Sequence, residues 1–195
     1  MFTGIIEAMG AIASLSHSQG NIDIWVSSPL SSVLTIDQSI SHEGICLTVV
    51  ELKESMYRVT AIAETINKTT IGDWQVGKKI NLERCMPATG RFDGHIVQGH
   101  VDQKGECISV TEQNGSWIYE FKYQPSLQNI VVEKGSICIN GTSLTAFDTI
   151  ADRFKVAIIP YTYEYTTIHA IVEGSWVNLE FDIIGKYVAR IMQLK

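Results

Sequence analysis

The sequence has few of the residues that mark disulfide-rich, fibrous or membrane proteins. Only four prolines and four cysteines occur among 195 residues, and no two cysteines form a Cys-x-x-Cys pair, so a disulfide framework is not indicated. Charged residues make up 18%, which argues against a long coiled coil or a disordered tail. No apolar run approaches the roughly 20 residues of a membrane span.

Positive charge is also scarce. Lysine and arginine number 15 against 21 acidic residues, for a net charge of −6 and a pI near 5.3, which is not the electrostatic profile of a nucleic-acid binder. The segment Met1–Glu7 lacks a basic region followed by an apolar core, so we expect no signal peptide. With 45% apolar residues, the sequence predicts a globular, reduced, cytoplasmic protein.

What the sequence does contain is a long internal duplication. The segment Gly44–Thr48 (GICLT) recurs as Gly141–Thr145 (GTSLT), at an offset of 141 − 44 = 97. Asn81–Glu83 (NLE) recurs at the same offset as Asn178–Glu180. This period is longer than the roughly 20–50 residues of solenoid repeats. It therefore predicts two homologous domains.

Each half has the pattern of short strands. Asn21–Val26 and Ser116–Lys122 alternate between polar and apolar residues, as half-buried strands do. Glycine and asparagine interrupt the pattern at short intervals. Many short strands in under 100 residues predict a small closed β-barrel. We therefore expect an all-β protein with one barrel at 1–95, a second at 96–185, and a tail at 186–195.

The tail has a helical pattern. Apolar residues recur there at spacings of three and four: Ile184, Tyr187, Val188, Ile191 and Met192. This predicts a short amphipathic C-terminal helix that begins near Gly185. Its apolar face could pack on its own domain or contact another copy of the chain. Short helices are also expected at Ser27–Ser32 and Pro125–Val131.

Three residues stand out as candidates for chemistry. His95 and His100 lie five residues apart in a glycine-rich segment. On a strand they would point to opposite faces, which is poor geometry for a shared metal, but either could move protons near neutral pH. Cys46 is a nucleophile if its thiol pKa is lowered, or a small core residue if it is not. Its counterpart Ser143 would make the second of two related small-molecule pockets a hydroxyl site.

Five segments form a combination that is more specific than its parts. They are Met1–Glu7, Ser39–Val49, Gly94–Asp102, Asn140–Thr145, and Ile159–Thr162 with Thr166 and Thr167. Together, over essentially the whole chain, they resemble the riboflavin synthase alpha-chain family. The resemblance implies two six-stranded Greek-key β-barrels in tandem with a short C-terminal helix, assembled as a homotrimer.

The resemblance also implies a reaction. Two molecules of 6,7-dimethyl-8-ribityllumazine dismutate by four-carbon transfer, giving riboflavin and 5-amino-6-(D-ribitylamino)uracil in the final step of riboflavin biosynthesis. It implies no metal and no redox cofactor, a site between the N-barrel of one subunit and the C-barrel of its neighbour, and an association with lumazine synthase. Two similar pockets can hold two identical substrates in a reactive arrangement.

The roles of individual residues are likewise implied by the resemblance. We expect His100 to move protons, Cys46 and Ser39 to act as nucleophile or relay, and Thr48 to orient the substrate. The N-terminal and first-pocket ligand contacts are expected at Gly4, Ile5, Ile6, Cys46, Leu47, Thr48, Thr60, Ala61, Ile62, Ala63, Glu64 and Thr65, the last six forming a strand. The second pocket is expected at Gly99, His100, Val101, Lys134, Ser143, Leu144, Thr145, Ala157, Ile158, Ile159, Pro160, Tyr161 and Thr162.

One residue departs from the pattern, and two rival functions stay open. Glu43 stands where the family has Asn before Gly, so either the turn differs or Glu43 adds a local negative charge. A non-catalytic lumazine- or flavin-binding protein of the bioluminescence antenna type shares this fold, and a structural β-barrel without ligand is a second rival. Because both Gly-His elements and the second Ser-Leu-Thr are present, the sequence favours the enzyme.

Overall fold

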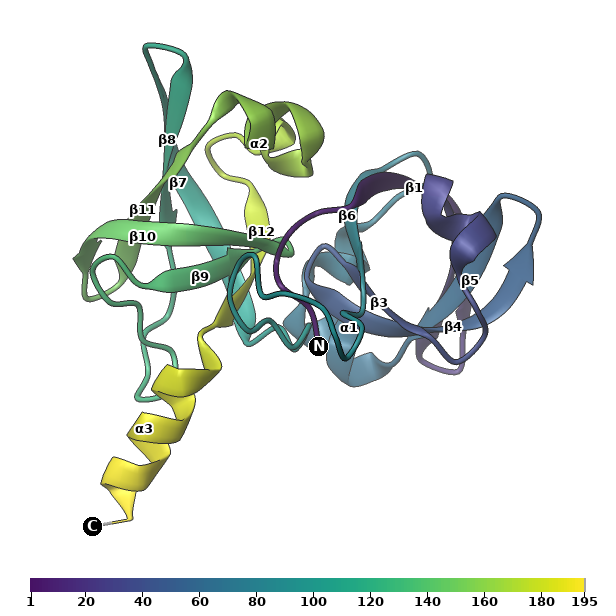
Figure 1. The fold of residues 1–195 in the computed structure, drawn as a ribbon, viewed down its shortest axis with the longest axis horizontal. Coiled ribbons are helices and arrows are strands. Elements are labelled where there is room, and N and C mark those ends of the chain that lie inside the picture. The colour runs from purple at the N-terminus through teal and green to yellow at the C-terminus, as the bar shows by residue number, and fades with distance from the viewer. Residues whose placement is uncertain (195) are drawn as a thin grey trace.

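The computed structural model describes residues 1–194, and these form two closed six-stranded antiparallel β-barrels (Figure 1). Residue 195, the last of the expected tail, lies outside the described residues. The first barrel has the strand order β1-β2-β5-β4-β3-β6. Its strands are β1 (Ala8–Ser18), β2 (Asn21–Ser27), β3 (Ser39–His42), β4 (Ile45–Lys53), β5 (Met56–Ala61) and β6 (Lys79–Arg84).

The second barrel repeats this topology. Its strands are β7 (Gln103–Gln113), β8 (Ser116–Lys122), β9 (Ser136–Ile139), β10 (Thr142–Ile150), β11 (Arg153–Ile158) and β12 (Trp176–Phe181). The closed order β10-β11-β8-β7-β12-β9 becomes the order of the first barrel when each strand is replaced by its repeat counterpart. In both barrels three consecutive hairpin-paired strands are joined by an earlier strand, which is a Greek key. The predicted all-β tandem-barrel fold is confirmed.

Alternation along the strands produces the two cores. In β2, Ile22, Ile24 and Val26 are buried while the residues between them are partly exposed, because successive side chains of a strand point to opposite faces. The first core is mainly aliphatic, whereas the second contains a cluster of aromatic rings. These rings belong to Tyr119, Phe121, Tyr123, Phe154 and Phe181.

Short helices connect the strands. They are η1 (Pro29–Val33), α1 (Ala63–Lys68), η2 (Thr70–Asp73), α2 (Pro160–Tyr165) and η3 (Thr167–Ala170). The helix expected at Ser27–Ser32 is therefore present as η1, but the one expected at Pro125–Val131 is absent, since those residues contain no helical turn in the described chain. The strand expected over Thr60–Thr65 is also wrong, because β5 ends at Ala61 and α1 follows.

The tips of two equivalent hairpins meet where the barrels touch. Glu43 and Gly44 have φ values of 50° and 80°, and Asn140 and Gly141 have 46° and 83°, so both hairpins carry the same left-handed two-residue turn. A Cβ on Gly44 would lie 2.8 Å from the Gly141 nitrogen, and the converse distance is also 2.8 Å. Only glycine permits this approach. The alternative of a different turn at Glu43 is thus wrong.

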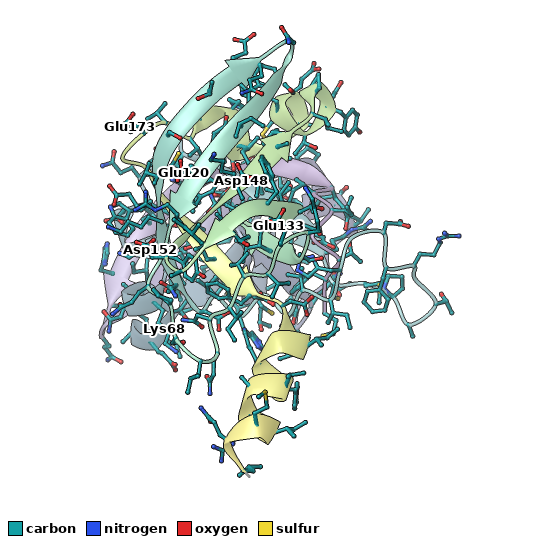
Figure 2. The ribbon with its side chains drawn as sticks, turned by 90° about the vertical axis from the view of Figure 1, so that its left-hand side faces the viewer. Lys68, Glu120, Glu133, Asp148, Asp152 and Glu173 are labelled. Atoms are coloured by element: carbon teal, nitrogen blue, oxygen red, sulfur yellow. The ribbon has the colours of Figure 1, made fainter. Side chains whose placement is uncertain are left out.

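The C-terminal helix α3 (Ile183–Gln193) extends away from the second barrel (Figures 1 and 2). It begins earlier than expected because Asp182 caps it, accepting a hydrogen bond from the Ile184 N–H at 3.0 Å, and aspartate is a stronger N-cap than a glycine such as Gly185. Among residues 1–194, no helix is both long and apolar enough to cross a membrane.

Candidate functional site

Two glycine segments cross between the barrels and lie against the hairpins. The Cys46 N–H donates to the Gly99 carbonyl at 2.8 Å, and the Ser143 N–H donates to the Gly4 carbonyl at 2.8 Å. Both glycines have a φ of 78°, and a Cβ on either would lie 2.6 Å from the Cβ of its partner. The repeats therefore build the same close contact twice, with a thiol in one and a hydroxyl in the other.

The pairing exchanges the segments between the repeats. Gly4 precedes the first barrel but contacts the second, and Gly99 precedes the second barrel but contacts the first. The crossing is held by the bridge between Phe2 and Val97, whose N–H groups donate to each other's carbonyls at 2.7 and 3.1 Å. Gly99, which is expected in the second pocket, thus contacts Cys46 of the first barrel within the chain, because sequence order does not reveal which barrel a connecting segment touches.

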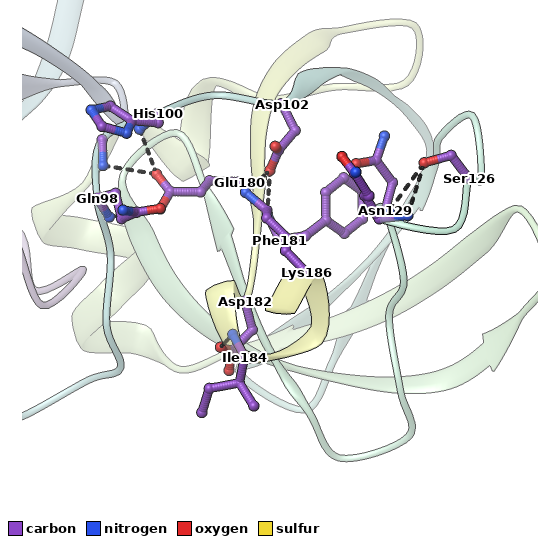
Figure 3. A network of polar contacts seen from close by, with 12 residues as sticks. Gln98, His100, Asp102, Ser126, Asn129, Glu180, Phe181, Asp182, Ile184 and Lys186 are labelled. Carbon is purple, nitrogen blue, oxygen red and sulfur yellow. Dashed lines mark hydrogen bonds and ion pairs between the residues drawn. The ribbon is translucent and has the colours of Figure 1, made fainter. Parts of the chain in front are cut away.

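A buried glutamate holds each glycine segment. The Glu83 carboxylate accepts hydrogen bonds from the N–H groups of Thr3 at 2.6 Å and Gly4 at 2.9 Å. The Glu180 carboxylate accepts three such bonds, from the N–H groups of Gln98 at 2.6 Å, Gly99 at 2.8 Å and His100 at 2.9 Å (Figure 3). Burial raises the pKa of both carboxyl groups. We call these residues the glutamate clamps.

A small cavity lies at the contact between Cys46 and Gly99, and we call it the Cys46 site. Its volume is about 210 Å³. Its lining comprises Ile45, Cys46, Glu64, Thr65, Lys68, Thr69, Gly99, His100 and Val101. Helix α1 brings Thr65 to this wall, and its ends are supported by the Lys68–Glu64 ion pair at 3.3 Å. The cavity thus unites six of the expected ligand contacts, and two of these six, Cys46 and His100, are also expected catalytic residues.

The Cys46 side chain points outwards from the first barrel. Leu47 is buried in the core, so its neighbours Cys46 and Thr48 face the other side of β4. Thr48 is opposite Ser39 on β3 in the strand register. Burial raises the pKa of the Cys46 thiol, while a hydrogen bond with the Ser39 side chain opposes this rise. Near neutral pH the group is therefore a thiol that can relay a proton, rather than a preformed thiolate.

The second region, which we call the Ser143 site, includes His95, which the sequence marked as a possible proton mover but to which the resemblance gave no role. His95 Nδ1 lies 2.6 Å from the Ser143 hydroxyl oxygen, and the His95 N–H donates to the Thr3 carbonyl at 3.1 Å. Burial lowers the pKa of His95, and the nearby Asp182 carboxylate opposes this. The Gly-His-x-x-x-Gly-His spacing was the available signal: its two histidines serve different barrels because the segment is an irregular crossing and not a strand.

Other expected contacts lie elsewhere. Lys134 is exposed, pairs with Glu133 at 3.7 Å and lies over the Phe147 ring at 5.2 Å. Ala61 and Ile158 are fully buried core residues, so they support a pocket wall from inside. The following expected contacts are exposed at the surface: Ile5, Ile62, Ala63, Thr145, Ala157, Ile159, Pro160 and Tyr161. Ile6, Thr60, Leu144 and Thr162 are partly buried.

Known proteins share both the sequence pattern and the fold. The family described as the lumazine binding domain matches residues 3–85 and again residues 98–182. A riboflavin synthase from Actinobacillus pleuropneumoniae is 41% identical over 100% of this chain and 91% of that protein. One from Bacillus subtilis (strain 168) is 39% identical over 98% of this chain and 90% of its own length.

A solved structure adds a likeness of fold. The crystal structure of LumP complexed with 6,7-dimethyl-8-(1'-D-ribityl) lumazine superposes with a TM-score of 0.84. It is 22% identical and covers 93% of this chain and 99% of that one. The two domain matches coincide with the two barrels, and the relatives above extend over nearly the full length. The chain therefore belongs to the riboflavin synthase family with tandem lumazine-binding domains.

Proposed function

We propose that this chain dismutates two molecules of 6,7-dimethyl-8-ribityllumazine, yielding riboflavin and 5-amino-6-(D-ribitylamino)uracil. The relatives that match over nearly the full length are riboflavin synthases. The same dismutation is therefore the enzymatic activity that we assign to this chain. The structural observation that carries it is the repeated contact of Cys46 with Gly99 and Ser143 with Gly4. Two related sites suit a reaction with two identical substrates, because binding both converts an encounter into a positioned pair.

The Cys46 site is our candidate for the proton-transfer chemistry. His100 is exposed and sits next to Gly99, which touches Cys46, so its imidazole can reach a bound ligand and accept the proton lost from the 7-methyl group. The Cys46 thiol, whose pKa is raised by burial, suits the role of relay better than that of thiolate nucleophile. Thr48, exposed opposite Ser39, orients the substrate in this proposal.

The Cys46 site is too small to enclose the substrate alone. Small-molecule sites usually occupy about 300–1,000 Å³, whereas this cavity has about 210 Å³. We propose that a neighbouring chain completes it, N-barrel to C-barrel, in a homotrimer. The exposed apolar side chains of α3 support an assembly contact: Ile184, Tyr187, Val188, Ile191 and Met192. Light scattering coupled to size-exclusion chromatography would show a mass of three chains, and a monomer that is fully active would contradict this.

Three further points belong to the same proposal. The domain division at 1–95 and 96–185 is supported by barrels that end at Arg84 and begin again at Gln103. A cytoplasmic location is in keeping with the four free cysteines. An association with lumazine synthase would supply the substrate where it is used, and co-purification of the two proteins would test it.

Turnover of the purified protein tests the function. Incubated with 6,7-dimethyl-8-ribityllumazine, the protein should produce riboflavin, detected by its yellow-green fluorescence. A bound blue-emitting lumazine without turnover would instead indicate the antenna type. The three alanine variants Cys46→Ala, Ser39→Ala and His100→Ala should each slow turnover, since general acid–base groups contribute about 10²–10⁴-fold. Near wild-type rates in all three would refute the assigned roles.

A further inference from the structure

An acidic residue stands beside the glutamate clamp in each repeat, at an offset of 102 − 7 = 95. In the first repeat, Glu7 accepts hydrogen bonds from the Arg84 N–H at 3.0 Å and from its guanidinium Nε at 2.8 Å. In the second, Asp102 Oδ2 accepts from the Phe181 N–H at 2.9 Å and pairs with the Lys186 ammonium at 2.6 Å. The acidic residue is thus paired with a positive charge from strand β6 in the first barrel and from α3 in the second.

The pair in the second barrel is the more buried of the two. The side chains of Lys186 and Asp102 are 17% and 20% exposed, against 39% and 30% for Arg84 and Glu7. Partial withdrawal from water strengthens the attraction between opposite charges. It also makes the loss of one partner costly, because the other charge would remain half-buried and unpaired. Lys186 is therefore a firm connection between α3 and the barrel.

This connection leads directly to the segment that carries His100. Asp102 is two residues after His100, and Phe181 directly follows Glu180, whose carboxylate holds the Gln98, Gly99 and His100 N–H groups. Figure 3 shows the clamp and the Asp102–Lys186 pair side by side at the start of α3. The positive charge of Lys186 also favours the ionised form of Glu180, which is the better acceptor for three N–H groups.

We propose that Lys186 is a positioning residue, which ties α3 to the Gln98–His100 segment and so sets the place of His100 in the Cys46 site. The proposal rests on the proposed function only in giving His100 a reaction to serve. Since the apolar face of α3 is our candidate assembly contact, the same tie would make the placement of His100 respond to whatever α3 touches. No equivalent helix follows β6, so the first repeat has no such tie among the described residues.

The titratable neighbours of Glu180 determine how the protonation of its carboxyl group depends on pH. They come from the crossing segment, β4, β9 and α3, and are His100, Asp102, Cys46, Cys138 and Lys186. Burial raises the pKa of both thiols, so neither is ionised near neutral pH. Removing the charge of Lys186 should therefore raise the pKa of Glu180 and weaken the clamp toward acid.

Amide hydrogen exchange of the full-length protein tests the tie without substrate. In Lys186→Met, which keeps the aliphatic stem, the amides of Gln98, Gly99 and His100 should exchange about tenfold faster at pH 6, because a neutral carboxyl is a weaker acceptor for their N–H groups than a carboxylate. The amides of Thr3 and Gly4, held by Glu83, should not change. Lys186→Arg should restore protection. Arg190→Met removes another exposed positive charge from α3 and should match wild type.

Kinetics supply the functional readout. In Lys186→Met, kcat should fall about tenfold at pH 6 with KM within about twofold, and the acid limb of the kcat profile should move to higher pH. Asp102→Asn, which keeps an oxygen for the Phe181 N–H but breaks the ion pair with Lys186, should also lower kcat, without moving the acid limb upward because Lys186 keeps its charge; it tests the tie if Lys186→Met fails to fold. Unchanged exchange at Gln98–His100, an unmoved acid limb in Lys186→Met, or the same effect from Arg190→Met would overturn the proposal. An inactive wild type would refute the proposed function alone, because the exchange result would still stand or fall by itself.

Discussion

The two repeats hold their sites in the same way but present different groups there. In each, a glutamate clamp holds a glycine segment, and the hairpin donates an N–H to the glycine carbonyl. The first repeat then presents the Cys46 thiol with His100 nearby, whereas the second presents the Ser143 hydroxyl against His95. The difference teaches that the supporting frame was duplicated as a unit, while the reactive groups vary on it.

A second difference lies where the two hairpin turns meet between the barrels. The Glu43 carboxylate accepts from the Asn81 N–H at 2.7 Å and the Thr167 hydroxyl at 2.8 Å. Its counterpart Asn140 accepts from the Asn178 N–H at 2.8 Å. Both side chains accept a hydrogen bond from a backbone N–H of the last strand of their barrel, but only the Glu43 side chain can carry a charge. The expectation of a local negative charge at Glu43 thus becomes a question of pH.

The largest effect is expected from filling the glycine contacts. Gly99→Ala would put a Cβ 2.6 Å from the Cys46 Cβ at a φ of 78°, so the segment must move and turnover should fall at least about 100-fold. The free energy of unfolding should fall by about 2–4 kcal/mol. Gly4→Ala should destabilise equally, because its contact with Ser143 is the same. Turnover and chemical denaturation measure the two effects.

Gly115→Ala is the matched control. Gly115 has a similar φ of 83° but nothing within 4 Å of the added Cβ. It should therefore show the backbone strain alone, about 1 kcal/mol, with full activity. If Gly99→Ala behaved like Gly115→Ala, the close packing of the crossing segments would not matter.

The next effect concerns the residue that differs between the two equivalent turns, Glu43 in the first and Asn140 in the second. Burial raises the pKa of Glu43 from 4.5 to about 7, so the folded protein holds a proton that the unfolded chain releases. Stability from this group is complete below pH 4.5 and is lost as pH rises through about 7, by about 3 kcal/mol. Glu43→Asn, which gives both turns the same residue, should remove this loss of stability. The difference between wild type and variant, measured by denaturation at pH 5 and pH 8, isolates Glu43 from other titrating groups.

Glu43→Gln provides a control for side-chain length. It should match Glu43→Asn at pH 8, where both variants avoid a buried charge. A variant that was less stable than wild type at pH 8 as well as at pH 5 would mean that the ionised carboxylate contributes more through its hydrogen bonds than its burial costs.

A smaller effect should follow from making the reactive groups alike. Cys46→Ser gives both sites a hydroxyl, which can still relay a proton, so we expect kcat to fall about tenfold with lumazine affinity nearly unchanged. Fluorescence titration and turnover measure the two quantities. The reciprocal change, Ser143→Cys, should alter kcat less than Cys46→Ser. Equal losses from the two changes would show that the sites are chemically equivalent.

The smallest effect is expected at Arg84, the exposed partner of Glu7 in the first repeat. Arg84→Met breaks the ion pair with Glu7, whose side chains are 39% and 30% exposed, and pairs of this kind contribute up to about 1 kcal/mol. Thermal unfolding should therefore change little, and amide exchange at Gln98–His100 should not change at all. A loss as large as that of Lys186→Met would remove the distinction between the two repeats.

Much of the fold could be predicted because it depends on local pattern. The duplication and the strand alternation gave two barrels, since residues such as Ile22, Ile24 and Val26 show their burial directly in sequence. The reactive cysteine, serine and histidines could also be chosen, because they stand at equivalent points of a repeat or in an unusual glycine-rich segment.

What could not be predicted depends on how the barrels meet. The contact of Gly99 with Cys46 joins residues 53 positions apart (99 − 46) across two domains, and no periodicity encodes it. The short helix α1 follows β5 after a single residue, so its Thr-containing sequence read as a longer strand. The partner of His95 could not be predicted either, because Ser143 lies 48 residues away in the sequence.

The crossing of the glycine segments also constrains how such a duplicated protein can diverge. Each repeat encodes a wall of the site that the other repeat completes. A change at Cys46 is therefore tested by natural selection together with Gly99 and His100, and a change at Ser143 together with Gly4 and His95. Each site combines residues from both repeats, so substitutions in one repeat are constrained by the residues that they contact in the other.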